Sequence, residues 1–164
     1  MKRIGLLSDT HGKLPDAFFD FFGEVDEIWH AGDIGSMEVL KQIESFKPTR
    51  AVWGNIDGHE LRRAVPGMQH FKVEDCMVVM IHIGGYPGRY TPDAARILRS
   101  YCPKLFITGH SHILKVMYDK KYECLHINPG AAGSYGFHTH ITMVRFEISG
   151  DKIENLEVYE KYRR

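Results

Sequence analysis

The stretch IGLLSDTHG, residues 4–12, combines a short apolar run with a polar ending. Its first four residues have the length and hydrophobicity of a buried strand, and Gly12 permits a tight turn after them. Asp9 and His11 stand two positions apart, so an extended segment presents both side chains on one side. The stretch predicts a strand that carries two metal-competent side chains at its carboxyl end.

The same arrangement recurs along the chain. Polar side chains follow the apolar segments EIWH (27–30), AVW (51–53), VVMI (78–81) and LFIT (105–108), often beside a glycine. Ligands of α/β proteins bind in the crevice at the carboxyl ends of the strands. We therefore expect one site built from Asp9, His11, Asp33, Asn55, His82, His110 and His112.

The segments between these endings predict the fold class. Strands at 4–7, 27–30 and 50–53 alternate with helices at 15–22 and 36–46, which favours parallel strands. Further strands are predicted at 69–73, 77–82, 104–108, 114–118, 123–127, 140–147 and 153–159, with a helix at 92–101. We expect one α/β domain over residues 1–164, with two sheets packed together and helices outside.

Composition excludes several classes of protein. Of the 164 residues 43% are hydrophobic, which is enough for a packed core, and 21 basic residues balance 21 acidic ones. Such neutrality provides no extended nucleic-acid surface. The longest apolar run, 76–81, is far shorter than the about 20 residues of a membrane span. The three cysteines lack a CxxC pair, so we expect a reducing cytoplasm as the compartment.

The number of candidate ligands indicates more than one metal ion. Seven ligands are too many for one tetrahedral ion, whereas one bridging carboxylate allows two ions with four protein ligands each. That division leaves open positions for water and substrate, as in two-metal hydrolytic sites. Mixed imidazole and carboxylate ligands suit Mn, Fe, Co, Ni or Zn better than Mg or Ca.

The order of these motifs resembles a known family. SDTHG (8–12), HAGDI (30–34), WGNID (53–57), a strand ending in His82, GHSH (109–112) and NPG (128–130) resemble the calcineurin-like metallophosphoesterase superfamily, specifically its small bacterial and archaeal phosphodiesterases. The resemblance covers the chain from Ile4 to about Gly130. It implies two mixed β-sheets packed as a sandwich, with helices on the outer faces.

The resemblance also implies a role for each ligand. Asp9, His11 and His112 would hold one ion, Asn55, His82 and His110 the other, and Asp33 would bridge both. The implied reaction is hydrolysis of a small, nucleotide-like phosphate ester by a hydroxide that bridges the ions, with manganese as the favoured metal. A phosphodiesterase is favoured over a phosphomonoesterase, and Asn55 would also orient the phosphate.

Two departures from the family pattern affect the substrate side of the site. Many relatives have a histidine directly after the motif asparagine, but Ile56 stands here, which leaves Asp57 and His59 as candidates for protonating the leaving group. His59 is also a candidate substrate contact, and loop orientation is the alternative for Asp57. After Asn128, the segment 131–137 lacks the family's arginine. Asn128 either orients a ligand histidine or is a turn residue.

Other residues and functions have simpler alternatives. We expect His30 and His126 in the core, His70 on a surface strand, and His138 and His140 in a strand. The phenylalanines between 18 and 22 are expected to pack a helix, and the alternative for part of this cluster is an exposed contact in a homo-oligomer.

A subunit of the retromer complex has the same fold and works as a protein-binding scaffold with a degraded metal site. The presence of all seven ligand residues here favours an enzyme over such a scaffold.

Overall fold

Two mixed five-stranded sheets form the molecule, which a computed structural model describes over residues 1–163. One sheet has the order β10-β9-β1-β2-β3 and the other β4-β5-β6-β8-β7. The first contains β1 (Lys2–Leu7), β2 (Glu27–His30), β3 (Thr49–Ala51), β9 (His140–Ser149) and β10 (Lys152–Tyr162). The second contains β4 (Met68–Val73), β5 (Cys76–Ile81), β6 (Leu105–Ile107), β7 (Leu114–Asp119) and β8 (Cys124–Pro129).

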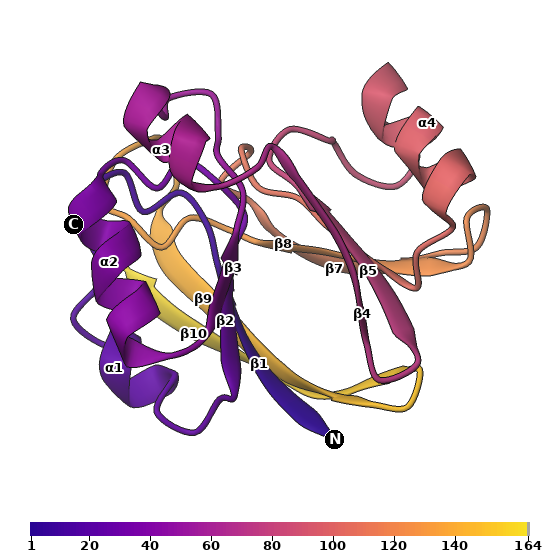
Figure 1. Cartoon of the computed structure of the whole chain (residues 1–164), viewed down its shortest axis with the longest axis horizontal. Helices are drawn as coiled ribbons and strands as arrows, with labels where there is room; N and C mark the ends of the chain where they lie inside the picture. Colours follow the sequence, from indigo (N-terminus) through magenta and orange to yellow (C-terminus); the bar gives the residue numbers. More distant parts are fainter. Residues whose placement is uncertain (164) are drawn as a thin grey trace.

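The helices lie outside this pair of sheets. They are α1 (Phe18–Phe21), α2 (Met37–Phe46), α3 (His59–Ala64) and α4 (Pro92–Tyr101). In Figure 1, α1 and α2 cover the outer side of the first sheet and α4 lies outside the second. Within residues 1–163, none of these helices has the length and hydrophobicity to cross a membrane. The predicted fold class, an α/β sandwich of two mixed sheets with outer helices, is confirmed.

Strand periodicity explains how the layers are filled. Ile4 and Leu6 of β1 are fully buried in the core between the two sheets, whereas Leu7 faces the helices. Gly5 also lies on the helix side, and a Cβ there would come within 2.7 Å of the Phe22 ring. A glycine is therefore needed where the ring of Phe22, the residue that follows α1, packs against β1.

The second sheet follows the same alternation. Val78 and Met80 of β5 pack into the core between the sheets, and Val79 packs beneath α4 with Leu98. Phe106 of β6 joins this outer cluster, while its neighbours in the strand point inward. The central strands of both sheets, such as β5 and β6, are thus buried on two faces, which fits their nearly continuous apolar sequences.

The helix starts follow capping chemistry where the sequence provides it. The Ser36 and Thr91 side chains accept hydrogen bonds from the Val39 amide (3.3 Å) and the Ala94 amide (3.1 Å), and α2 and α4 begin at the next residues. Ala17 precedes α1 and caps it with no side-chain hydrogen bond. The helix predicted at 15–22 is therefore shorter, because its first residues form a turn closed by the Phe18 amide and the Pro15 carbonyl.

Two local predictions are wrong. Helix α3 was not predicted, because its sequence HELRRA is short and only Leu61 is buried, which leaves no apolar periodicity. His138 does not belong to a strand, because residues 130–139 form a loop and β9 begins at His140. The loop carries three glycines, which outweigh the alternating pattern of the residues that follow.

Two histidines lie in the core, as predicted. His30 and His126 are fully buried, and the His126 ring packs against Tyr90 and Phe106. Burial disfavours the charged imidazolium and lowers the pKa of His126 to about 4. The folded protein therefore keeps this imidazole neutral at pH values where the unfolded chain protonates it.

Folding stability should fall as the pH drops from about 6.5 to about 4, because the unfolded state then binds a proton at His126 that the folded state excludes. At pH 5 this one group should lower the free energy of unfolding by about 2 kcal/mol relative to pH 7. Urea unfolding at both pH values should show a smaller loss in His126→Phe than in the unmodified protein. A His70→Phe variant, altered at an exposed strand histidine, is the matched control, and equal losses in all three proteins would contradict this account.

Candidate metal centre

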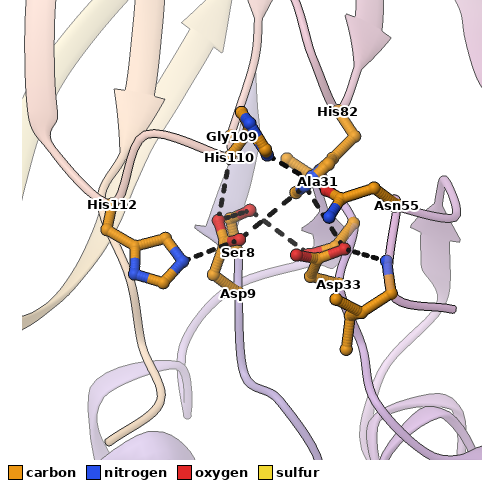
Figure 2. A network of polar contacts seen from close by, with 12 residues as sticks. Ser8, Asp9, Ala31, Asp33, Asn55, His82, Gly109, His110 and His112 are labelled. Atoms are coloured by element: carbon orange, nitrogen blue, oxygen red, sulfur yellow. Dashed lines mark hydrogen bonds and ion pairs between the residues drawn. The ribbon is translucent and has the colours of Figure 1, made fainter. Parts of the chain in front are cut away.

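The structure brings all seven predicted site residues together at the carboxyl ends of the strands. They follow five strands of both sheets: Asp9 and His11 after β1, Asp33 after β2, Asn55 after β3, His82 after β5, and His110 and His112 after β6. Figure 2 shows the labelled carboxylates at the middle of the cluster with imidazoles directed at them. The site therefore lies where the two sheets meet at one end of the sandwich.

One group of ligand atoms gathers around Asp9. Its Oδ1 lies 3.3 Å from His112 Nε2 and 3.8 Å from His11 Nε2. Its other oxygen, Oδ2, accepts hydrogen bonds from the Ser8 hydroxyl (2.6 Å) and the His110 amide (3.1 Å). The protein thus holds one carboxylate oxygen and leaves the other facing two imidazoles.

A second group gathers around Asp33. Its Oδ1 lies 3.3 Å from His82 Nε2, and Asn55 Oδ1 lies 3.0 Å from His110 Nδ1. Asp33 Oδ2 lies 3.5 Å from His11 Nε2, which belongs to the first group. The two oxygens of Asp33 therefore face different groups, which is the arrangement a bridging carboxylate requires.

The residues fit divalent ions on two grounds. Ligand atoms about 2.1 Å from a common ion lie roughly 3 to 3.5 Å from one another, and the carboxylate–imidazole separations approach this range. Three buried atoms, Asp9 Oδ1, His11 Nε2 and His82 Nε2, also have no hydrogen-bond partner within residues 1–163. Buried polar atoms are rarely left unpaired in native proteins, so their convergence indicates a bound cation.

The electrostatics of the cluster favour positive charge. Burial opposes ionisation of Asp9, but the imidazoles of His11, His112 and His82 close to its carboxylate outweigh burial and hold the pKa of Asp9 far below its ordinary value. Burial also opposes ionisation of Asp33, and His82 lowers the pKa of that carboxyl. Conversely, Asp9 raises the pKa of His11. The carboxylates are thus ionised, and protons or metal cations balance their charge.

Hydrogen bonds outside the cluster orient two of the imidazoles. The His82 Nδ1–H donates to the Ala31 carbonyl at 2.7 Å, which directs Nε2 at the carboxylates. His112 Nδ1 lies 3.1 Å from His138 Nδ1, and His138 Nε2 lies 2.7 Å from the Gly133 carbonyl. A carbonyl oxygen only accepts hydrogen bonds, so His138 Nε2 carries the proton of this ring, and the unprotonated His138 Nδ1 accepts a hydrogen bond from the His112 Nδ1–H.

This chain of hydrogen bonds assigns a role to His138 that sequence reasoning missed. With the His112 proton on Nδ1, the lone pair of His112 Nε2 faces Asp9 and is free to bind a metal. The expected strand concealed this role of His138. The available signal was its position in the glycine-containing loop that follows the NPG motif.

The backbone of the site is locally unfavourable. Five candidate ligand residues, Asp9, His11, Asp33, His110 and His112, have φ angles between 50° and 72°, a left-handed conformation that is uncommon outside glycine. Each such residue costs of order 1 to 3 kcal/mol, which the surrounding structure must offset. Strained backbone of this kind clusters at functional sites, where it fixes the direction of a side chain.

Glycines allow the loops to approach the carboxylates. A Cβ at Gly54 would fall on Asp33 Oδ1, and one at Gly109 would fall on the Ser8 hydroxyl and 3.0 Å from Asp9 Oδ2. The glycines before Asn55 and His110 are therefore needed for contact between loops from different strands. This close approach is the physical reason for the GN and GH pairs in the sequence.

The remaining residues of the sequence analysis lie around this centre. Asp57 accepts hydrogen bonds from the amides of Ile34 (3.1 Å), Gly35 (2.9 Å) and Gly54 (2.9 Å), so it orients the loop, as one alternative proposed. His59 is exposed at the first position of α3.

Asn128 holds two loops together. Its amide nitrogen donates to the Gly109 carbonyl and the Ser111 hydroxyl, both at 3.0 Å, and its oxygen accepts from the Gly130 amide at 2.9 Å. It therefore makes the turn at the end of β8 and also supports the loop that carries His110 and His112. Asn128 is thus a turn residue and at the same time a support for the loop of the ligand histidines, so the two roles considered as alternatives are combined in one side chain.

Comparisons with known proteins agree with this fold and identify similar sequences. Wild-type Vps29 from Entamoeba histolytica, solved in complex with Zn²⁺, has the same fold, with a TM-score of 0.76, 16% identity and 98% of each chain covered. A protein of Methanothermobacter thermautotrophicus named a probable metallophosphoesterase is 30% identical over 156 residues, covering 92% of this chain and 88% of that protein. A protein of Methanocaldococcus jannaschii named a phosphodiesterase is 24% identical over 149 residues, covering 81% and 86%.

The family comparison covers most of the chain. Residues 1–151 match the family described as the calcineurin-like phosphoesterase superfamily domain, and this range includes every side chain of the cluster. The order of the motifs, the pair of mixed sheets and the two ligand groups all agree with that match. The chain therefore belongs to the calcineurin-like phosphoesterase superfamily.

Proposed function

We propose that this protein is a phosphodiesterase that depends on two divalent metal ions. The observation that carries the proposal is the position of Asp33 between two groups of ligand atoms, one oxygen facing each group. The family match supports a phosphoesterase, and the relative named a phosphodiesterase supports hydrolysis of diesters. The substrate class proposed is a small, nucleotide-like phosphate ester.

Each ion would have its own ligands. Asp9, His11 and His112 would hold one ion, Asn55, His82 and His110 the other, and Asp33 both. Manganese is the metal we favour, and Fe, Co, Ni and Zn suit the same mixture of nitrogen and oxygen donors. When bound, such ions act as Lewis acids on phosphoryl oxygens and generate a hydroxide nucleophile from water near neutral pH.

The side chains of the protein supply negative charge to the site and fix the positions of the metal ligands. Asp9 and Asp33 contribute two buried negative charges, fewer than the positive charges of two divalent ions, so the loaded site would attract an anionic phosphate. Ser8, Ala31 and His138 fix the orientation of their ligand neighbours before any substrate arrives. Such preorganised polar groups need no rearrangement when charge develops in the transition state.

Two residues are proposed to act on the substrate side. The Asn55 side chain is exposed at the edge of the cluster, where its amide could orient a phosphate as well as bind metal. His59 lies four positions further along at the start of α3, and it remains the candidate for contacting the leaving group because the Asp57 carboxylate is engaged by three backbone amides.

Replacing a ligand should abolish metal-dependent turnover. With Mn²⁺ and bis-p-nitrophenyl phosphate, Asp33→Asn and His112→Ala should each lower kcat/KM at least about 100-fold, because each removes a donor that the fold positions for the metal. His140→Ala, at a histidine outside the cluster, is the matched control and should retain the original rate.

Three results would count against the proposal. An absence of turnover by the unmodified protein with Mn, Fe, Co, Ni and Zn would favour a non-catalytic scaffold. Turnover that survives in both variants would show that the proposed metal centre does not carry the activity. A preference for p-nitrophenyl phosphate over the diester would make the protein a phosphomonoesterase.

Removing the support of His112 should weaken metal binding without removing a ligand. His138→Phe should raise the Kd for Mn²⁺ about 10- to 100-fold, because His112 loses the acceptor that fixes its tautomer. Calorimetric titration measures this independently of activity, and His140→Phe is the control. If His138→Phe is folded and binds Mn²⁺ with unchanged affinity, the orienting role of His138 is wrong.

A further inference from the structure

A cleft of about 430 Å³ opens over the candidate metal centre, and its lining is divided in character. Side chains of both ligand groups line one part of it: His11, His110 and His112. Apolar side chains line another part: Ile113, Tyr135 and Phe137. The centre therefore has an apolar wall beside it, within reach of an ester substituent of a bound phosphate.

The wall is exposed to water although its side chains are large. The relative exposure of Phe137 is 103% and that of Tyr135 is 72%. Single exposed apolar residues are common on protein surfaces, but contiguous ones beside a polar site mark a binding surface. In this molecule they lie in the one loop that also orients His112 through His138.

Apolar exposure continues around the centre. Asn55, His82 and His112 are each followed directly by an exposed isoleucine. These residues are Ile56, Ile83 and Ile113. Ile56 stands where the sequence departs from the family pattern, so this departure places an apolar side chain beside the centre.

The part of the wall that contains Tyr135 and Phe137, here called the aromatic wall, is anchored to the rest of the fold. The Arg163 guanidinium donates hydrogen bonds to the carbonyls of Ser134 and Gly136, both at 2.7 Å, on either side of Tyr135. The Tyr135 ring stacks on His11, with ring centroids 5.4 Å apart and an interplanar angle of 29°. The ring is thus held against the first ligand group at a defined angle.

The charge of the side chains that line the cleft limits the substrates that it can bind. Within residues 1–163, no lysine or arginine lines it, so cations at the centre would be its main source of positive charge. A second phosphate group on the wall would lack a counter-charge, whereas a flat ring would find aromatic faces to stack on.

We propose that Tyr135 and Phe137 form a subsite for a flat aromatic substituent of a phosphate ester that carries a single phosphate. The inference rests on the proposed function and specifies its substrate class. A nucleobase and another aryl group share the chemistry that this wall recognises. Esters with small aliphatic substituents would bind through the phosphate alone.

Direct binding tests the subsite without requiring turnover. Calorimetry on the Mn²⁺-loaded protein compares phenylphosphonate with methylphosphonate, which present the same anionic group with and without a ring. The unmodified protein should bind phenylphosphonate about tenfold more tightly, the size expected for one stacking contact. Tyr135→Ala and Phe137→Ala should reduce this ratio towards one with little change in the Kd for methylphosphonate.

Two further measurements identify the kind of ring that binds and test whether removing any exposed tyrosine gives the same effect. Thymidine 5′-monophosphate binding more tightly than phenylphosphonate would identify a nucleobase subsite, and the reverse order would identify a site for a simpler aryl group. Tyr118→Ala removes an exposed tyrosine of β7 that does not line this cleft, and it should leave the ratio unchanged.

The possible failures are distinguishable. Equal affinity of the unmodified protein for the two phosphonates, or a ratio that survives in both cleft variants, would overturn the aromatic subsite. If the Mn²⁺-loaded protein binds neither phosphonate, the proposed phosphate site at the metal centre fails as well.

Discussion

The position of the Asp33 carboxylate is the constraint on which the site depends. One of its oxygens faces His82 and the other faces His11, and these histidines come from different sheets. A buried carboxylate among imidazoles is costly unless positive charge accompanies it. The left-handed backbone at Asp33 and the missing side chain at Gly54 are both needed to hold it there. The sandwich can thus be regarded as a frame that brings two strand ends to one carboxylate.

Two kinds of groups surround the centre: fixed polar groups that orient the ligands, and exposed apolar side chains beside the cleft. Hydrogen bonds with Ser8, Ala31 and His138 set the direction of Asp9, His82 and His112, while Asn128 supports the loop that carries His110 and His112. The proposed aromatic wall belongs to the loop that also supplies His138. Substrate selection and metal binding would therefore share one structural element, anchored by the C-terminal end of the described chain.

Sequence patterns predicted most of the architecture because much of the information is local. Strands ending in polar residues, and helices opened by Ser36 and Thr91, depend on neighbouring residues and were located within a few positions. Helix α3 escaped prediction because tertiary contacts determine a short polar helix more than periodicity does. The role of His138 was also hidden, because its partner His112 lies 26 positions away and only the folded loop brings them together.

The central claim is that one chain holds two metal ions that share Asp33. Titration of the metal-free protein with Mn²⁺, followed by electron paramagnetic resonance, tests this directly because two ions joined by a carboxylate are magnetically coupled. The account predicts saturation at two Mn²⁺ per chain with the spectrum of a coupled pair, and loss of that coupling in Asp33→Asn. Saturation at one ion, or two ions that remain magnetically independent in the unmodified protein, would contradict it.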